Sequence, residues 1–426
     1  MPRMRPLLTI LLLTLGLLSF APQAQAQVEA SRHRHHHGGG THIVIFEAGM
    51  SAQARRQAVE SMGGKVVQDF AFIDAALVQF AKTKSTGGAE RFQRAPRVQA
   101  VEEDVYQKWI KAEPSSVGST PFPSARELLN TAERSTDDAP PTGVVSGQQT
   151  TPWGIERVKA PGAWKRTRGR GVKVAVIDTG IDYTHPDLAA NYKGGINIVA
   201  PEAQPLDDQG HGTHVAGTIA AVRGGSVVGV APEASLYAVK VLDKDGGGTA
   251  SDIVEGITWA TEHGMQVINM SLGGTGTKAM ERAIAAALKA GVTVVAAAGN
   301  DPNAPVSAPA NYPGVIAVSA STKEDTLAFF STTGPEVAFI APGHEILSDA
   351  PGGGTATHSG TSMATPHVAG LAALAIANGA RGPQAVRAAL AAACVQLPGL
   401  NGEQQGSGLP QADKMVGVSQ DYYAMR

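Results

Sequence analysis

Cysteine is almost absent from this chain of 426 residues, which contains Cys394 and no other. A single cysteine excludes an intrachain disulfide, so stability has to come from packing, with bound metal as the alternative. Charged residues are also sparse at 17%, whereas hydrophobic residues reach 43%. This composition excludes a disordered chain and predicts a large buried core, divided among more than one domain.

Neither sign of charge dominates, because 35 Lys and Arg stand against 37 Asp and Glu and the formal net charge is −2. A chain without a basic field does not attract polyanions, so we expect no nucleic-acid partner. Long hydrophobic runs are scarce, and the one candidate is Leu7–Ala21, which follows Arg3 and Arg5. Small residues ending at Ala26 complete a signal-peptide pattern over residues 1–26. We therefore expect secretion, to the periplasm or the cell exterior, with no membrane span once this segment is removed.

Four segments follow the signal peptide. Residues 27–40 are rich in His and Gly and are interpreted as a solvated leader. Residues 41–110 show a β-α-β-β-α-β pattern, typical of a small α+β domain. Residues 111–147 are rich in Pro, Ser, Thr and Gly, with one helical island at 124–135, and are interpreted as a linker. In the first domain we expect strands at 42–46, 65–70, 74–80 and 98–106 and helices at 51–64 and near 87–95.

Residues 148–426 alternate short Val-, Ile- and Ala-rich runs with helical patterns. Such runs predict a parallel β-sheet sandwiched by helices, an α/β fold. Functional side chains in these sheets gather at the carboxyl ends of the strands.

A serine precedes one of the apolar helical runs, in "HSGTSMATPHVAG" at residues 358–370. Ser362 could cap that helix, since hydroxyls accept bonds from its first N–H groups, or it could be a nucleophile. Pro366 is compatible with the first helical turn, where N–H groups lack partners. The choice depends on whether the chain supplies a base, an orienting carboxylate and oxyanion donors.

Candidates for these roles exist, and each also has a plainer interpretation. Asp178 ends the apolar strand of "VAVIDTGID", where an acidic residue is commonly a cap or turn residue. His211 could be structural or, with His214, half of a metal site, although the glutamate of a zinc HExxH helix is missing. Asn300 ends "VVAAAGN" and on its own would be a turn residue.

Three sequence motifs taken together indicate a function more specifically than any single residue does. "VIDTGID", "GHGTHVAGT" and "GTSMATPHVAG" carry Asp178, His211 and Ser362 in the chain order that subtilisins use. The sequence resembles the subtilisin family of serine proteases from about Gln149 to near Val416. An α/β-hydrolase fits poorly, because Ser362 stands in G-x-S-x-A and the acid precedes it.

The resemblance implies an endopeptidase that acts through an acyl-enzyme and needs no cofactor for its chemistry. Ser362 would be the nucleophile, His211 the general base and Asp178 the residue that orients the imidazole. Asn300 would donate to the oxyanion together with the Ser362 N–H. The implied substrate-binding edges are Gly246, Gly247, Gly248, Ser271, Leu272 and Gly273.

The resemblance also implies partners and a maturation route. Polypeptides would be the substrates, and a monomer is expected. Residues 41–110 would be an inhibitory propeptide and folding aid, and the chain would be cut just before Gln148, so that the mature enzyme begins at Gln148. The expected pocket floor at 305–314 has no charged residue, which predicts an apolar or aromatic residue before the cleaved bond, with Asp301 as a nearby exception. The alternative function is a non-catalytic scaffold of the same fold.

A structural calcium site is implied less clearly. Gln149 and Asp187 match side-chain ligands of the family's site, but the loop at 222–229 is one residue short and lacks the expected asparagine. Calcium needs six to eight oxygen ligands. We therefore expect weak calcium binding and no metal in catalysis.

Overall fold

The computed structural model describes residues 40–80, 90, 92–110 and 149–417. The expected signal peptide, nearly all of the His- and Gly-rich leader, and the linker with its helical island lie outside these residues. Among the described helices, none combines the length and the apolar composition that a membrane crossing requires.

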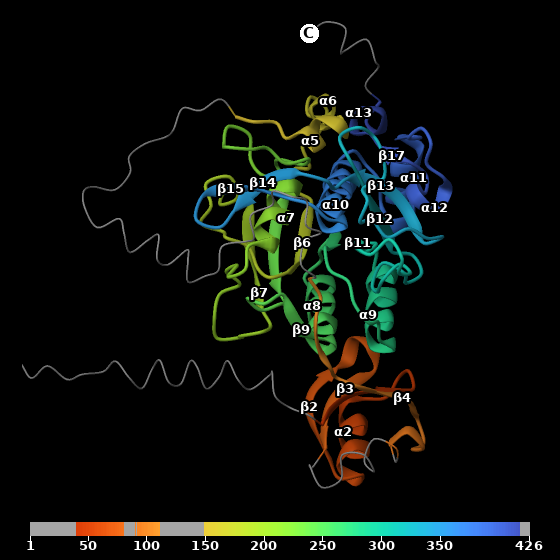
Figure 1. Cartoon of the computed structure of the whole chain (residues 1–426). Helices are drawn as coiled ribbons and strands as arrows, with labels where there is room; N and C mark the ends of the chain where they lie inside the picture. Colours follow the sequence, from red (N-terminus) through yellow and green to blue (C-terminus); the bar gives the residue numbers. More distant parts are fainter. Residues whose placement is uncertain (1–39, 81–89, 91, 111–148, 418–426) are drawn as a thin grey trace, which may run out of the picture. The chain divides into compact units, whose positions relative to one another are not determined.

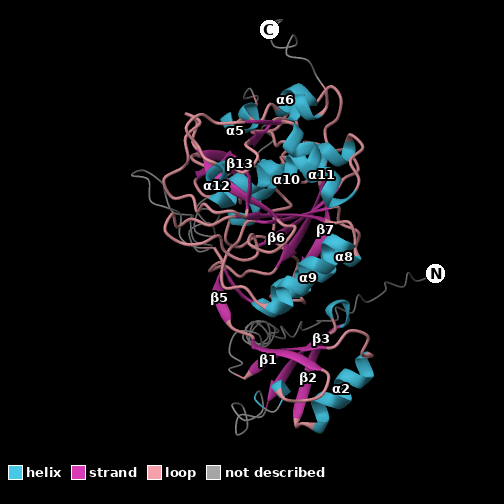
Figure 2. Cartoon of the chain, turned by 90° about the vertical axis from the view of Figure 1, so that its right-hand side faces the viewer, coloured by secondary structure: helices cyan, strands magenta, loops and turns pink. Residues whose placement is uncertain are grey.

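The N-terminal domain, residues 40–110, is a four-stranded antiparallel sheet with one helix against it (Figure 2). Its strands lie in the order β2-β3-β1-β4, and Val59 of the helix packs among Val44 and Phe46 of the central strand. The helix begins at Ser51, whose hydroxyl accepts the Ala54 N–H at 3.2 Å. The elements are β1 (Thr41–Phe46), α2 (Ala52–Ser61), β2 (Gly64–Phe70), η1 (Ala71–Ile73), β3 (Ala75–Phe80) and β4 (Val98–Glu103). Of the helix expected near 87–95, the described residues 90, 92 and 93 are helical.

The single strand expected at 98–106 is wrong, because the chain divides there. After β4 it leaves the sheet and forms β5 (Tyr106–Lys108), which pairs antiparallel with β9 (Gly247–Thr249). Asp104 lies at the break, and its carboxylate accepts the Ser251 N–H at 2.9 Å and the Ser251 hydroxyl at 2.7 Å. These long-range bonds explain why alternation along the sequence could not show the break.

The larger domain contains a seven-stranded sheet in which every neighbouring pair is parallel, in the order β13-β12-β11-β10-β6-β8-β7 (Figure 1). The strands are β6 (Lys173–Asp178), β7 (Tyr192–Asn197), β8 (Ser235–Lys240), β10 (Val267–Met270), β11 (Thr293–Ala297), β12 (Ile316–Ser321) and β13 (Val337–Pro342). The predicted parallel sheet between helices is thereby confirmed.

Helices cover both faces of this sheet. On one face α7 (His211–Ala220) and α10 (Thr361–Ala377) pack on Val174 and Val176 of β6. On the other, α8 (Ala250–Glu262) packs on β6, where Ala175 and Ile177 face it, and α9 (Lys278–Lys289) packs on β11. A strand that is covered on both sides needs apolar residues at every position, which explains its unbroken apolar run. The remaining elements are α5 (Trp153–Arg157), α6 (Ala160–Ala163), β14 (Ile346–Ala350), β15 (Gly354–His358), α11 (Gly382–Ala392), β16 (Cys394–Val395), α12 (Gly402–Gln405), β17 (Leu409–Pro410) and α13 (Ala412–Met415).

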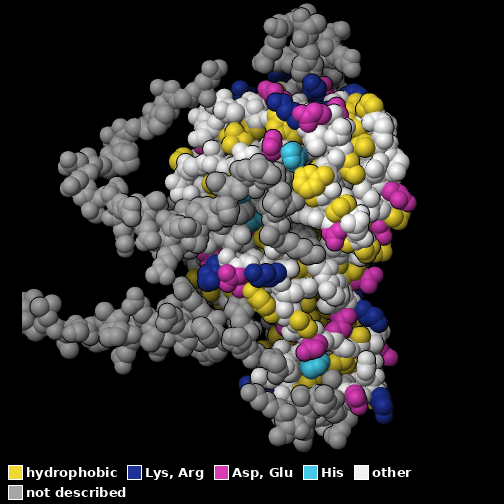
Figure 3. Space-filling model, viewed as in Figure 1, with side chains coloured by type: hydrophobic (Ala, Val, Ile, Leu, Met, Phe, Trp, Pro, Cys, Tyr) yellow, Lys and Arg dark blue, Asp and Glu magenta, His cyan; other side chains and the backbone are white. Residues whose placement is uncertain are grey.

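The surface agrees with the balanced composition. On the face shown in Figure 3, positive and negative side chains are interspersed over the described residues. No single sign of charge covers the visible part of these residues.

A buried histidine lies in the middle of the central helix α10. His367 is fully buried, its Nδ1 lies 2.9 Å from the Met363 carbonyl oxygen, and its Nε2 has no hydrogen-bond partner among the described residues. Gly154 leaves room for it, since a Cβ there would lie 2.4 Å from Nε2. Burial lowers the pKa of His367 to about 4.

This histidine should make the fold sensitive to acid. The folded ring stays neutral down to about pH 4, whereas an unfolded histidine takes its proton near pH 6.5, so the free energy of unfolding falls as the pH drops between these values. As the pH drops from 6.5 to 4, the free energy of unfolding should fall by roughly 3 kcal/mol more in the wild type than in His367→Asn. Denaturant unfolding at several pH values, in a Ser362→Ala background, measures the difference. The exposed His263 provides the control variant His263→Asn, which should leave the slope unchanged; equal slopes for all three proteins would contradict the prediction.

Candidate active site

Three elements bring the predicted triad residues to one edge of the large sheet. Asp178 is the last residue of β6, His211 is the first residue of α7, and Ser362 is the second residue of α10. Asn300 follows β11, the second strand over from β6 in the sheet. The carboxyl ends of parallel strands and the N-termini of the helices therefore supply all four side chains.

Asp178 and His211 form a buried pair. The imidazole Nδ1 lies 2.9 and 3.0 Å from the two carboxylate oxygens, and Asp178 Oδ1 also accepts the Thr179 N–H at 2.7 Å. Asp178 is 0% and His211 3% exposed. Because Nδ1 faces the carboxylate, it carries the ring proton and Nε2 is the basic nitrogen. Gly212 permits this approach, since a Cβ there would lie 2.1 Å from the Gly180 carbonyl oxygen.

The capping interpretation of Ser362 is not supported by the geometry. The helix begins after Gly360, and no side chain caps it. Ser362 lies inside the first turn, with its Oγ 3.2 Å from the Ser271 carbonyl oxygen. A hydroxyl in this place is available for chemistry at a helix N-terminus, where the helix dipole favours developing negative charge.

Pro366 lies in the second turn of α10, so its expected place in the first turn is wrong. A proline there removes the N–H that would bond the carbonyl of Ser362 four residues earlier. The hydroxyl of Ser271 donates to that carbonyl at 2.8 Å, and Asn269 in turn donates to Ser271 Oγ at 3.0 Å. Ser271 thus supports the turn that carries Ser362. Sequence reasoning missed this role, although a proline four residues after the serine was the available signal.

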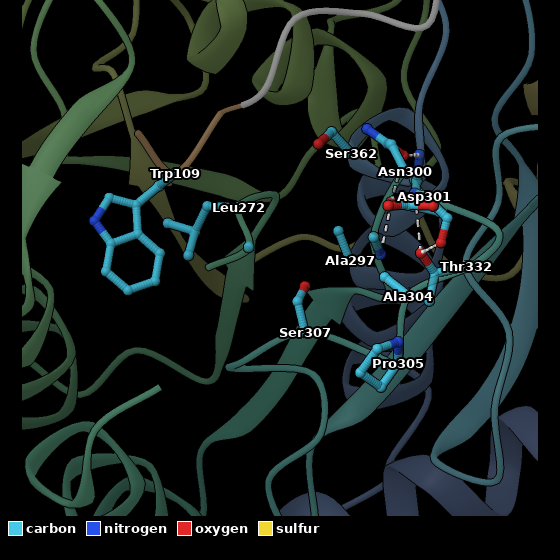
Figure 4. A pocket seen from close by; sticks show the side chains of 13 residues that line it. Trp109, Leu272, Ala297, Asn300, Asp301, Ala304, Pro305, Ser307, Thr332 and Ser362 are labelled. Atoms are coloured by element: carbon cyan, nitrogen blue, oxygen red, sulfur yellow. Dashed lines mark hydrogen bonds between the residues drawn. The ribbon is translucent and has the colours of Figure 1, made fainter. Parts of the chain in front are cut away.

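The side chain of Asn300 is oriented by Thr361. Asn300 Oδ1 accepts the Thr361 N–H at 2.8 Å and its hydroxyl at 2.9 Å. The amide nitrogen is left facing Ser362, as Figure 4 shows. A Cβ on Gly360 would lie 3.3 Å from Asn300 Nδ2 and 3.6 Å from the Ser362 nitrogen, so the two donors border one space that glycine keeps clear. Sequence reasoning missed Thr361, whose contacts show that Asn300 is more than a turn residue.

A cavity that is open to solvent lies beside Ser362 (Figure 4). Pro305 and Ser307, from the expected floor at 305–314, line it. Asp301 is the charged residue of its lining, but this residue is exposed and its Oδ1 accepts the Asn303 N–H at 2.9 Å. The lining residues are Trp109, Leu272, Gly273, Ala297, Gly299, Asn300, Asp301, Ala304, Pro305, Ser307, Thr332, Thr361 and Ser362.

The N-terminal domain bonds to both predicted substrate-binding edges. Gln107 and Lys108 pair with Gly248 and Gly247. Beyond them, the Trp109 N–H donates to the Gly246 carbonyl at 3.0 Å. On the other edge, the Gly273 N–H donates to the Trp109 carbonyl, also at 3.0 Å. Leu272 and Ser271 continue this second edge, and Figure 4 shows Leu272 between Trp109 and Ala297. The segment therefore lies where an extended peptide would add as a strand.

Two carboxylates of the N-terminal domain accept hydrogen bonds from the N-termini of α8 and α9. Glu102 accepts the N–H groups of Lys278 and Ala279 at 2.7 and 3.1 Å, at the start of α9. Asp104 accepts the N–H of Ser251, the second residue of α8. In addition, Arg282 of α9 donates to the carbonyl oxygens of Phe46 and Ile73 at 3.1 and 3.2 Å. Carboxylates at helix N-termini are stabilising because they meet unpaired N–H groups and the positive end of the dipole.

In the loop that was expected to bind calcium weakly, the polar groups are hydrogen-bonded to Gln149 and Asp187. Gln149 Nε2 donates to the carbonyls of Val222 and Val227 at 2.9 and 2.8 Å, and its Oε1 accepts the Gly224 N–H at 3.0 Å. Asp187 Oδ2 accepts the N–H groups of Ser226 and Val227. The oxygens that a calcium ion would need are thus engaged by N–H groups, so the residues present fit a tight calcium site poorly.

A second cluster, His185, Asp187 and Asp349, brings three possible metal-ligand atoms within 4.8 Å of one another. It also fits a metal poorly, because both ring nitrogens of His185 are engaged. Nδ1 accepts the Asp187 N–H at 3.1 Å, and Nε2 lies 2.9 Å from the Gly354 carbonyl oxygen, which requires a proton on Nε2. Burial and the neighbouring Asp187 raise the pKa of Asp349 to about 8, so at neutral pH this carboxyl holds a proton.

Two family models and several known proteins match this chain. Residues 169–409 match the subtilase family, and residues 23–104 match the fervidolysin N-terminal prodomain. Subtilisin E of Bacillus subtilis is 41% identical over 348 residues, which cover 79% of this chain and 80% of that protein. Subtilisin BL of Lederbergia lenta is 51% identical over 229 residues, or 53% of this chain and 84% of that protein. A subtilisin of Bacillus pumilus is 49% identical over 238 residues, or 54% and 86%.

Removal of divalent cations should have little effect on stability. We expect EDTA to lower the melting temperature of the Ser362→Ala chain by no more than about 3 °C, since a saturated tight site would contribute several kcal/mol. Differential scanning calorimetry measures this, and EDTA presaturated with calcium is the control. A drop of more than about 10 °C would show that the loop at 222–229 rearranges into a strong site.

Proposed function

The chain belongs to the subtilase family and is a serine endopeptidase with an N-terminal prodomain, and we propose that Ser362, His211 and Asp178 form its catalytic triad. The observation that carries this assignment is the buried Asp178–His211 pair at the sheet edge that also holds the Ser362 hydroxyl. No cofactor is needed, because the three side chains supply nucleophile, base and orienting group.

The mechanism follows from the roles of these atoms. Ser362 Oγ attacks the peptide carbonyl while His211 Nε2 takes its proton, and the imidazolium then protonates the leaving amine. Asp178 holds the proton on Nδ1 and stabilises the imidazolium. Asn300 Nδ2 and the Ser362 N–H donate to the oxyanion, and Thr361 fixes the direction of the amide. Water then hydrolyses the acyl-enzyme by the same route.

The prodomain is proposed to inhibit the enzyme and to assist its folding. Its segment from Tyr106 to Ile110 bonds to both substrate-binding edges, so a substrate cannot occupy them at the same time. A parallel sheet with long-range pairings folds slowly, and a domain docked on α8 and α9 would stabilise that part of the sheet early. We assign the prodomain to residues 41–110 and the peptidase domain to 148–426, with the final cut just before Gln148 in the linker.

The remaining parts of the proposal concern the cell and the substrate. The pattern over residues 1–26 supports export by a signal peptide, and the enzyme is proposed to act outside the inner membrane as a monomer on polypeptides. The cavity lining supports cleavage after apolar or aromatic residues, because a buried cation would find only one carboxylate there, and Asp301 is exposed.

Ser362→Ala should abolish hydrolysis while the fold survives, because only the nucleophilic oxygen is lost. Turnover of a chromogenic peptide should fall below about 10⁻³ of wild type. In the absence of other proteases, the variant should remain a full-length precursor starting near Gln27, as read by mass spectrometry. Ser407→Ala, at an exposed serine remote from the triad in sequence, is the control and should mature normally.

A fluorophosphonate probe separates this function from the non-catalytic scaffold. The matured wild type should be labelled on Ser362 and Ser362→Ala should not. An unlabelled wild type, or a Ser362→Ala chain that still matures to the same N-terminus, would refute self-processing by this serine.

The cavity lining predicts cleavage preference. Peptides with Phe or Leu before the cleaved bond should have kcat/KM at least about tenfold above those with Lys or Arg. Asp301→Asn is the matched control, and it should leave this ratio nearly unchanged because the carboxylate is exposed. Dominant cleavage after Arg or Lys in a peptide library would overturn the prediction.

A further inference from the structure

Two side chains of the prodomain segment lie against Gly274, which follows the Ser271–Gly273 edge. Residues two apart in a strand share a face, and Gln107 and Trp109 both contact Gly274 and its surroundings. Trp109 is 1% exposed, and its indole Nε1 donates to the Gly248 carbonyl at 3.0 Å. Lys108 lies on the other face and is exposed. The edge therefore recognises alternate side chains as well as the main chain.

Gln107 makes a two-point contact with the main chain of Thr275. Its Nε2 donates to the Thr275 carbonyl at 3.1 Å, and its Oε1 accepts the Thr275 N–H at 3.0 Å. A primary amide carries the donor and the acceptor that this pair of groups requires. Glutamate keeps an acceptor but places a carboxylate against a carbonyl oxygen, and lysine keeps only donors.

Gly274 makes room for both side chains. A Cβ at this position would lie 2.8 Å from the Trp109 ring and 2.9 Å from Gln107 Oε1, closer than real Cβ contacts come. Its backbone is fixed from the other side, because the Gly274 N–H donates to the Ala308 carbonyl at 2.9 Å. The edge thus has a defined shape at this point.

We propose that Gly274 and the Thr275 main chain form a distal substrate subsite that selects a glutamine side chain two residues before a large aromatic residue. The inference rests on the proposed function, in which Gly246–Gly248 and Ser271–Gly273 bind substrate as extended strands. A polypeptide bound in the register of the prodomain segment places the residue equivalent to Gln107 over Thr275. The substrate class is therefore a polypeptide with the pattern Gln-x-Trp on the amino side of the cleaved bond.

The selectivity is modest because the contact is partly open to water. Each hydrogen bond between neutral groups contributes little net free energy, so loss of both should lower kcat/KM about fivefold. Glutamate should be disfavoured further, by about tenfold, because its charge meets a carbonyl oxygen.

Internally quenched peptides that span Tyr106 to Ser116 of this chain test the proposal on the matured enzyme. In matched peptides the glutamine is replaced by alanine, methionine or glutamate, and a control peptide replaces the lysine at position 108 by alanine. The glutamine peptide should be cleaved about fivefold better than the alanine and methionine peptides. The lysine replacement should change kcat/KM less than about twofold. Mass spectrometry confirms that every peptide is cut at the same bond.

Two enzyme variants test the main-chain contact. Thr275→Ala should retain the glutamine-to-alanine ratio, because the bonds are made by the backbone, whereas Gly274→Ala should bring the ratio close to one. Equal kcat/KM for the glutamine and alanine peptides, or cleavage at shifted bonds, overturns the subsite while the proposed peptidase function stands. Failure to cleave any peptide refutes the proposed function instead.

Discussion

The contact between Asp178 and His211 is the constraint on which the rest of the site depends. A fully buried carboxylate is costly unless donors surround it, and here the imidazole and the Thr179 N–H supply them. This contact requires α7 to begin directly against the loop after β6. Gly212 makes that approach possible, because any Cβ would collide with the Gly180 carbonyl. The glycine before the first threonine in "GHGTHVAGT" is therefore a packing requirement of the pair.

Much of this architecture could be predicted from the sequence. Unbroken apolar runs predicted the buried parallel strands, since β6 sends Val174 and Ile177 to opposite helical layers. Three strings located the side chains at the sheet edge. What sequence could not show depends on contacts between distant segments. The division of 98–106 into β4 and β5 follows from the bond of Asp104 to Ser251, and nothing local to Asp104 indicates it.

The supporting contacts within the site were hidden for the same reason. Ser271 was predicted as part of a substrate-binding edge and Thr361 had no predicted role, yet Ser271 bonds the carbonyl freed by Pro366 and Thr361 orients Asn300. For the calcium loop, the shortened sequence with a missing ligand predicted weak binding, which stays a prediction. In the structure the amide of Gln149 bonds the loop's carbonyls directly, so side-chain hydrogen bonds hold the segment that would otherwise close around an ion.

The prodomain contacts divide into two sets. The segment from Tyr106 to Ile110 bonds the substrate-binding edges. Glu102 and Arg282 act outside those edges, at α9, and their bonds do not involve the cleaved peptide. The proposed cut before Gln148 would therefore remove the covalent tether while both sets of contacts persist. Inhibition should outlast processing, and the enzyme becomes active when the prodomain itself leaves or is digested.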